Sequence, residues 1–375
     1  MVSQKNKTIK TILYSMKCFE PTLTSKDATR ISRLILSGEI GFGDSVKKFE
    51  NKFAPYSNKK YNIGLNSASA AAYCLFHFLY EKYGSCDVYT PSLGFASVSW
   101  AALKNGHSIH FVDVDENLLL DLDSYISIRQ ENLKKGKTNS QKQSVIMPVL
   151  YGGVSNIPGF KKKLEETSWK DIVVVDSAHS VKPEICCDYI FFSFHPAKPL
   201  AMSCGGLLGT NDQSASEYIM KYRNFGREQI GDTYDIVSNG FNFYMNNLNA
   251  ELGLSQLDTC FESVKLRKKN LEYLESKIKP ELGYITSHDI NSSYYLCTLI
   301  LNKPQSTYLR QKMRSLHGAA SFHYPFLHQT TFFKSEVSLR KTENLQDRII
   351  NLPIHQNLTH TDMNKVADIL NKEET

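Results

Sequence analysis

DIVVVDSAHSVKPEICCDYIFFSFHPAK, residues 171–198, contains two apolar runs that each lead into polar residues. The runs Asp171–Val175 and Asp188–Phe194 are almost continuously apolar and do not alternate between apolar and polar side chains. Strands that are covered on both faces have this pattern, because neither face meets water. The stretch therefore predicts two buried strands of a parallel sheet, with Asp176 and Lys198 placed after their carboxyl ends.

The flanking sequence repeats the same alternation of strands and helices. Further apolar runs predict strands at Asp87–Thr90, Ser108–Val114, Ser144–Leu150 and Gly206–Gly209. Helical patterns lie between the runs, at Ala70–Tyr83, Ser97–Lys104 and Pro158–Glu166. This order is typical of an α/β fold in which helices cover both faces of a mainly parallel sheet.

The pattern changes after Asn242, which indicates a second, smaller domain. Two long helices are expected there, followed by a mixture of short strands and helices typical of an α+β domain. We expect a large domain at 1–257 and a small C-terminal domain at 258–375. The predicted elements of this part are Leu248–Leu257, Phe261–Ile278, Tyr294–Leu301, Gln305–Leu316 and Thr361–Leu370.

The composition excludes several classes of protein. The chain has 375 residues, 41% of them hydrophobic and 22% charged, which is ordinary for a globular protein. Its net charge is only +6, and its densest basic stretch, Lys134-Lys135 with Lys137, is expected in a solvated polar loop from Arg129 to Gln143. Basic residues do not alternate with aromatic ones along one face, so we expect no nucleic-acid partner.

The eight cysteines form no C-x-x-C pair, and no Cys/His spacing matches a zinc site, so we expect no metal. Most of them lie in apolar segments, as free thiols of a reducing compartment do. No apolar run approaches the roughly 20 residues that a membrane span requires. These features predict a cytoplasmic protein without a membrane partner.

Asp176 and Lys198 are the strongest candidates for chemistry. Taken singly, Asp176 is explained as a helix cap and Lys198 as a surface charge. However, ligands of open α/β sheets bind at the carboxyl ends of the strands, where both residues are expected. Pyridoxal 5′-phosphate (PLP) requires an acid that keeps its ring nitrogen protonated and a lysine that forms a Schiff base. The pair therefore predicts a PLP site with Lys198 as the catalytic residue.

Other residues near these strand ends fit the same cofactor, although each also has a plainer explanation. His179 is expected to face the ring hydroxyl, and Phe95 to stack on the ring; singly, either would be a packing residue. Ser193 is expected to donate to the phosphate. Asn66-Ser67-Ala68-Ser69-Ala70 opens a helix, and its backbone N–H groups and serines suit a phosphate, although a simple Ser cap would explain the same residues.

Together these motifs closely resemble the sugar aminotransferases of the DegT/DnrJ/EryC1/StrS family, within fold type I of PLP enzymes. The resemblance follows the family's order through most of the chain. It includes the phosphate turn, the cofactor Asp segment, the Schiff-base motif and the C-terminal Leu-Pro-x-His segment. The matching stretches are 37–41, 49–54, 67–70, 111–115, 176–179, 193–198, 240–243 and 351–355.

The resemblance implies a role for each candidate residue. Lys198 is the Schiff-base lysine and Asp176 the partner of the ring nitrogen. Asn242 corresponds to an Asn that reaches the phosphate of the neighbouring subunit, which implies a homodimer with composite active sites. The remaining cofactor-binding residues are Ala68, Ser69, Phe95, His179 and Ser193.

Three departures from the family's pattern put the substrate in doubt. Ala68-Ser69 replaces the usual Gly-Thr, Cys204 replaces a Glu, and Tyr244 replaces an Arg. We hypothesise that this Glu and Arg belong to one charge network and were lost together. His323, Tyr324 and His328 form a further polar, aromatic cluster that is either in contact with substrate or, as we favour, engaged in packing.

The implied function is transfer of an amino group from L-glutamate to a nucleotide-linked 4-keto-6-deoxy sugar, for surface polysaccharides such as lipopolysaccharide or for other glycoconjugates. The altered positions leave a second acceptor open, a keto-phosphate or oxidised acidic sugar without a nucleotide. A PLP-dependent dehydratase or lyase would use the same scaffold, as would a PLP-binding protein without catalysis. Some relatives with His in place of this lysine are dehydratases, so Lys198 favours transamination.

Overall fold

A seven-stranded sheet forms the centre of the molecule in the computed structural model, which describes residues 16–138, 141–316, 318–322 and 324–372. The strand order is β1-β7-β6-β5-β4-β2-β3. β7 runs antiparallel to both of its neighbours, whereas the other pairs are parallel, so the predicted mainly parallel sheet is confirmed. The bounds are β1 (Tyr61–Leu65), β2 (Asp87–Pro91), β3 (Ser108–Val112), β4 (Ser144–Ile146), β5 (Ile172–Asp176), β6 (Tyr189–Ser193) and β7 (Gly206–Thr210).

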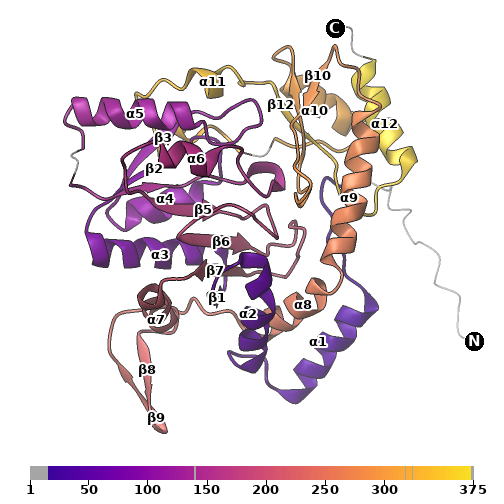
Figure 1. Cartoon of the computed structure of the whole chain (residues 1–375). Helices are drawn as coiled ribbons and strands as arrows, with labels where there is room; N and C mark the ends of the chain where they lie inside the picture. Colours follow the sequence, from indigo (N-terminus) through magenta and orange to yellow (C-terminus); the bar gives the residue numbers. More distant parts are fainter. Residues whose placement is uncertain (1–15, 139–140, 317, 323, 373–375) are drawn as a thin grey trace, which may run out of the picture.

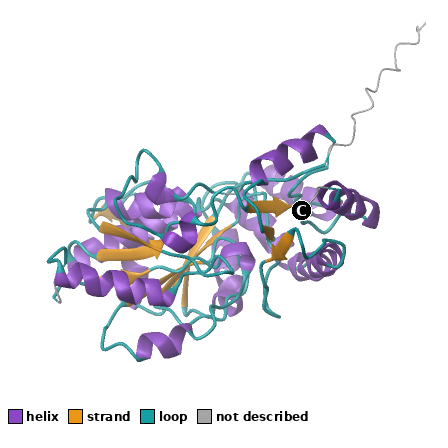
Figure 2. Ribbon diagram, turned by 90° about the horizontal axis from the view of Figure 1, so that it is seen from above, coloured by secondary structure: helices purple, strands orange, loops and turns teal. Residues whose placement is uncertain are grey.

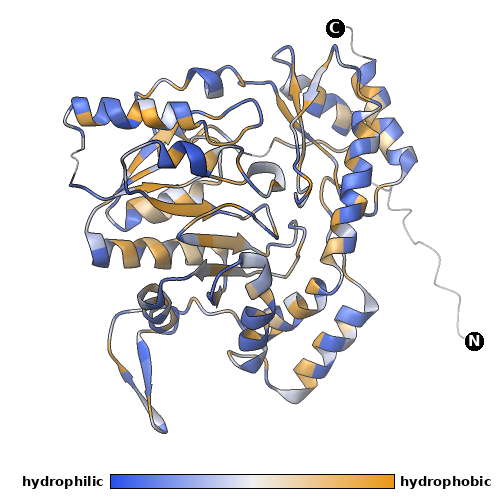
Figure 3. Ribbon diagram, viewed as in Figure 1, coloured by the Kyte–Doolittle hydropathy of each residue, from blue (hydrophilic) through white to orange (hydrophobic). Residues whose placement is uncertain are grey.

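Both faces of the sheet are buried, as the continuous apolar runs predict. In β6, Tyr189 and Phe191 belong to one hydrophobic cluster, while Ile190 and Phe192 belong to the cluster on the opposite face. Successive side chains of a strand point to opposite faces, so a strand covered on both sides must be apolar at every position. The central strands β5 and β6 are accordingly coloured mainly as hydrophobic in Figure 3.

Helices cover the two faces (Figure 2). The first face packs against apolar residues of α3 (Ala68–Tyr83), α4 (Ala96–Lys104) and α7 (Gln213–Tyr222). The second packs against α2 (Asp44–Ser57), α5 (Leu122–Lys134), α6 (Phe160–Glu165) and α8 (Asn247–Leu257). The N-terminal helix α1 (Ser25–Ser37) contacts α8.

A second, three-stranded antiparallel sheet lies in the C-terminal part, in the order β10-β11-β12. All of its strands follow residue 258, where we place the domain boundary, and the boundary itself stays a prediction. Met16, near the start of the chain, packs in the hydrophobic cluster of this sheet. The elements are α9 (Cys260–Glu275), β10 (Gly283–Ile285), β11 (Cys297–Leu301), α10 (Ser306–Ser315), α11 (Arg340–Glu343), β12 (Ile349–Leu352) and α12 (His360–Asn371), with short 3-10 turns at Tyr151–Gly153 and Leu327–Gln329.

The predicted loop from Arg129 to Gln143 is wrong over its first part, because α5 continues to Lys134. Arg129 is paired with the buried Asp171 and lies over the Trp169 ring, so this charged residue belongs to a packed helix face. β4 is shorter than predicted and ends at Ile146. Pro148, which has no N–H to donate to a neighbouring strand, follows closely.

A polar hairpin, β8 (Arg227–Ile230) with β9 (Thr233–Ile236), projects from the body below α7 (Figure 1). Most of its residues are exposed. None of the helices in the described part of the chain has both the length and the apolar character needed to cross a bilayer.

Candidate functional site

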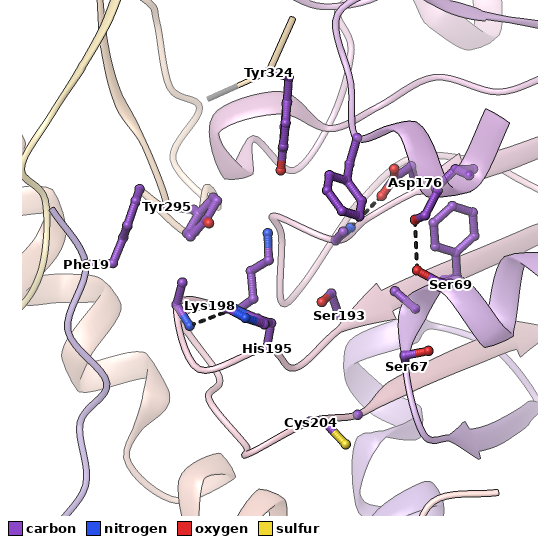
Figure 4. Close-up of a pocket in the computed structure, with 18 residues that line it drawn as sticks. Phe19, Ser67, Ser69, Asp176, Ser193, His195, Lys198, Cys204, Tyr295 and Tyr324 are labelled. Carbon is purple, nitrogen blue, oxygen red and sulfur yellow. Dashed lines mark hydrogen bonds between the residues drawn. The ribbon is translucent and has the colours of Figure 1, made fainter. Parts of the chain in front are cut away.

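A cavity of about 360 Å³ lies at the carboxyl ends of β5 and β6 (Figure 4). The two strands are parallel neighbours, with Asp176 opposite Phe191, so the segments that follow them leave the sheet at the same edge. The described residues that line the cavity include six of the predicted site residues: Ala68, Ser69, Phe95, Asp176, Ser193 and Lys198.

Lys198 reaches the cavity from a tight turn that follows β6. Its backbone N–H donates to the carbonyl of His195 at 2.8 Å, and Met202 N donates to Phe194 O at 2.8 Å, which closes the turn. The side chain is buried, with its amine pointing into the cavity. Burial lowers the pKa of the Lys198 amine to about 7, against the opposing attraction of Asp176. Near neutral pH this lysine can therefore both hold and give up a proton.

Asp176 is the last residue of β5 and faces the same cavity. Its Oδ1 accepts from the backbone N–H of Ala178 at 2.9 Å, which fixes the carboxyl group in the turn after the strand. Burial raises the pKa of Asp176 to about 6, although the Ala178 N–H and the Lys198 charge both act in the opposite direction. The cavity therefore holds one buried acid and one buried amine whose charged forms stabilise each other.

The N-terminus of α3 forms another wall. Ser67 is the N-cap and its Oγ accepts from Ala70 N, so the helix begins two residues earlier than predicted. Ser69 Oγ donates to Ser97 Oγ of α4 at 2.8 Å. A Cβ added at Gly206 would lie closer than 3.0 Å to backbone atoms of Ser67 and Ala68. Only glycine at position 206 therefore allows the start of α3 to lie this close to β7.

His179 and Phe95 both contact Tyr324, a residue from the C-terminal part of the chain. The Tyr324 phenol oxygen lies 3.0 Å from His179 Nε2, and the two rings are nearly parallel. The Phe95 ring lies 5.7 Å from that of Tyr324 and is 56% exposed at the mouth of the cavity. Tyr324 both packs against these residues and lines the cavity, and whether it contacts substrate stays open.

The other members of the predicted aromatic cluster behave differently. His328 is buried away from the cavity, where its ring lies 2.6 Å from Ser92 Oγ and 3.3 Å from the Glu343 carboxylate. This arrangement ties the segment that carries Tyr324 to the end of β2. His323 lies outside the described residues.

Asn242 is exposed and does not belong to the described residues that line the cavity of its own chain. Its backbone carbonyl accepts from the Asn66 side chain at 3.1 Å, next to the N-terminus of α3. The predicted role of its side chain, toward a neighbouring subunit, stays a prediction.

Sequence reasoning missed Phe19 and Tyr295, which complete the cavity wall. The two rings stack with centroids 5.3 Å apart, although their segments are remote in the sequence. No local pattern distinguishes either from a core aromatic residue, because their neighbours are set by tertiary packing.

Cys204 lines the cavity at the position where the family has a Glu, and its Sγ lies 3.5 Å from the Asn249 side chain. Tyr244 packs on Phe42 with ring centroids 5.2 Å apart. A Cβ on Gly205 would lie 3.4 Å from the Met245 side chain, so the residues that follow Cys204 and Tyr244 are neighbours. That the replaced Glu and Arg formed one network stays a hypothesis.

Comparison with known proteins identifies the family. The model of the DegT/DnrJ/EryC1/StrS aminotransferase family matches residues 21–371. The chain belongs to this family. This aminotransferase is 25% identical over 373 residues to UDP-4-amino-4,6-dideoxy-N-acetyl-beta-L-altrosamine transaminase of Campylobacter jejuni, with 93% of this chain and 94% of that protein covered.

Solved structures show the same fold. PseC of Helicobacter pylori, an aminotransferase involved in pseudoaminic acid biosynthesis, superposes with a TM-score of 0.84 at 21% identity, over 96% of this chain and 98% of that one. Spr1654 of Streptococcus pneumoniae, described as a sugar aminotransferase and solved in its PLP form, gives 0.83 at 21% identity, over 95% and 98%. The predicted family, fold class and aminotransferase activity are thereby confirmed.

Proposed function

We propose that this aminotransferase binds PLP through Lys198 and transfers an amino group from L-glutamate to a nucleotide-linked 4-keto-6-deoxy sugar. One observation carries the proposal: the Lys198 amine and the Asp176 carboxyl are both buried in one cavity at the carboxyl edge of the sheet. A buried amine and a buried acid with altered pKa values are the groups that this chemistry requires.

The residues around the cavity fit the cofactor. Lys198 would supply the amine for its aldehyde, and Asp176 would supply the acid for its ring nitrogen. The N-terminus of α3, with Ser69 and Ser193 nearby, offers backbone N–H groups and hydroxyls to a phosphate. Phe95 offers a ring face for stacking. When bound, PLP supplies an electron sink that allows the α-proton of an amino acid to leave.

The chain's own groups then carry the proton chemistry. Nζ of Lys198, with its pKa lowered to about 7, accepts the α-proton of the donor and returns it later. Asp176, buried and hydrogen-bonded to Ala178 N, balances positive charge inside the cavity. Tyr324 holds the His179 ring in a fixed orientation. The surrounding aromatic residues exclude water from Lys198, which strengthens each of these interactions.

The identity of the acceptor rests on the relatives. The Campylobacter jejuni relative is named as a transaminase of a UDP-linked amino-dideoxy sugar, and the match extends over nearly the full length of both chains. A nucleotide sugar of this type is therefore the acceptor that we propose, in the synthesis of a surface polysaccharide or another glycoconjugate.

One feature of the cavity favours a second acceptor. Cys204 contributes a thiol where the family pattern has a carboxylate, so Asp176 is the sole carboxylate among the described lining residues. A cavity with fewer negative charges binds anions more readily. A keto-phosphate or an oxidised acidic sugar without a nucleotide is therefore the second candidate.

We further propose a homodimer, because the exposed Asn242 next to the α3 N-terminus is available to a neighbouring subunit. The cytoplasm is the expected compartment, since all eight cysteines are unpaired, as a reducing environment maintains them.

The test is amine transfer from L-glutamate to a panel of UDP- and dTDP-linked 4-keto-6-deoxy sugars, keto-phosphates and oxidised acidic sugars, with products identified by mass spectrometry. An aminated nucleotide sugar with stoichiometric 2-oxoglutarate is the expected result. Amination confined to acceptors without a nucleotide would replace the first acceptor by the second. Release of 2-oxoglutarate beyond one equivalent per active site without any aminated product, or formation of a dehydrated sugar, would count against transamination.

A further inference from the structure

Tyr295 presents a ring face to the interior of the cavity. It lies in the loop before β11, and its backbone N–H donates to the Gly152 carbonyl at 2.9 Å. The side chain is 2% exposed, and Phe19 stacks against its ring. A ring that is anchored at its backbone and packed against a second aromatic residue has a fixed orientation.

Lys198 lies against this ring. Its Nζ is 4.2 Å from the Tyr295 ring centroid, and Figure 4 shows the amine beside Tyr295, in the space between Tyr295 and Tyr324. A lysine ammonium within about 6 Å of a ring centroid is attracted by the negative face of the ring, most strongly where water is excluded. Lys198 is only 8% exposed, so the attraction operates in a site of low polarity.

We propose that Tyr295 is a positioning residue for Lys198, whose ring face receives the lysine ammonium whenever the lysine is not bonded to the cofactor. The inference rests on the proposed function. When the donor's Cα–H bond breaks, its proton goes to Nζ of Lys198 and its electron pair passes to the cofactor. Lys198 is therefore an ammonium ion between the two proton transfers, and the ring face stabilises that form.

Other titratable groups around Lys198 also affect the pKa of its amine. Asp176 attracts the ammonium from the end of β5, while His195 in the turn after β6 lies close enough for the two charges to repel. Tyr324 lines the adjacent wall and is hydrogen-bonded to His179 behind it. Removing the ring leaves these groups in place and takes away one source of stabilisation of the ammonium form.

The experiment measures how fast the cofactor-free protein captures PLP, followed by visible absorbance in a stopped-flow instrument across pH. Only the neutral amine of Lys198 attacks the aldehyde, with release of water. The midpoint of the pH–rate profile, called the break below, therefore gives the apparent pKa of the lysine. Tyr295→Leu should move the break downward by about one and a half units, the size of a desolvated cation–π interaction. Tyr295→Phe keeps the ring face and should retain the wild-type break.

Two comparisons separate the ring's electrostatic effect from its packing. Replacing Tyr295 by a phenylalanine fluorinated on its ring preserves the shape and weakens the negative face, so the break should again fall. Tyr308→Leu is the matched control, since it removes an exposed ring whose centroid lies 5.8 Å from the Lys312 amine and which is not among the described residues that line the cavity. It should leave the break unchanged.

If the fluorinated and Tyr295→Leu proteins both retain the wild-type break, the inference is overturned; if Tyr295→Leu does not fold, the fluorinated protein decides alone.

Failure of the proposed function has a different signature. Borohydride reduction fixes the captured PLP to the lysine that bound it, and peptide mapping should identify that lysine as Lys198. A label on another lysine, or equal capture by Lys198→Ala, would overturn the cofactor assignment and not merely the role of Tyr295.

Discussion

The phenol oxygen of Tyr324 lies 3.0 Å from Nε2 of His179. This contact joins the C-terminal part of the chain to the turn after β5, next to Asp176. The Ser92–His328 contact anchors the same C-terminal segment at the end of β2. The orientation of His179 beside the cavity therefore depends on a residue that follows it by more than a hundred positions.

Tyr324→Phe removes this hydrogen bond and keeps the ring. We expect PLP to bind several-fold more weakly, since the loss of one buried hydrogen bond costs about 1 kcal/mol. Equilibrium titration of the cofactor-free protein measures the effect. Tyr308→Phe, at an exposed position of α10, should bind PLP as the wild type does. Unchanged binding in Tyr324→Phe would show that His179 does not need this partner.

Asp176→Asn retains the shape of the side chain and removes its charge. We expect the rate of the first half-reaction to fall by on the order of 100-fold or more, the scale seen when one preorganised electrostatic group is lost from an active site. Single-turnover mixing with L-glutamate measures it. A rate within a few-fold of the wild type would exclude Asp176 as the partner of the ring nitrogen.

Lys198→Met should stabilise the cofactor-free protein at pH 6. Burial lowers the pKa of Lys198 from 10.5 to about 7, so between these values the unfolded chain holds a proton that the folded chain does not. The free energy of unfolding of the wild type therefore rises with pH across this window, and the buried lysine destabilises the folded protein most below pH 7. The advantage of Lys198→Met, on the order of a few kcal/mol, should shrink from pH 7 to pH 10.

Thermal melts of the cofactor-free proteins at several pH values test this expectation. Lys47→Met, at an exposed position of α2, is the control and should show no comparable change with pH. An advantage of Lys198→Met that grows with pH would contradict the assignment of a lowered pKa.

Gly206→Ala should destabilise the protein strongly. Its Cβ would lie closer than 3.0 Å to backbone atoms of Ser67 and Ala68, which cannot rotate away as a side chain does. Overpacking of this kind costs about 1–3 kcal/mol or more, and here it also displaces the N-terminus of α3 from the cavity. We expect a lower melting temperature together with weaker PLP binding. Gly41→Ala, where a Cβ meets nothing within 4 Å, should change neither.

The central sheet could be predicted from the sequence because its signal is local. A strand such as β6 is buried on both faces, so every residue from Tyr189 to Phe192 is apolar, and a short window reveals it. Asp176 and Lys198 could be predicted for the same reason, since the ends of neighbouring parallel strands meet at one edge. Six of the eight predicted site residues line one cavity, while His179 contacts Tyr324 in its wall.

The remaining features depend on contacts that no local window contains. Tyr295 and Phe19 meet through the packing of the N-terminal segment against the C-terminal part. Arg129 is followed directly by polar residues at 130–132, and its pairing with Asp171 is a tertiary contact. The strand predicted from Tyr294 begins only at Cys297, because Tyr294 has a φ of 48°, in the left-handed region that strands do not adopt.

The most direct test of the central claim is the visible absorption spectrum of the purified protein with PLP, for wild type and Lys198→Ala, before and after L-glutamate. We predict an absorption band of lysine-bound cofactor in the wild type alone, which glutamate converts to the spectrum of the pyridoxamine form. The absence of this band in the wild type, or an identical band in Lys198→Ala, would contradict the assignment of Lys198.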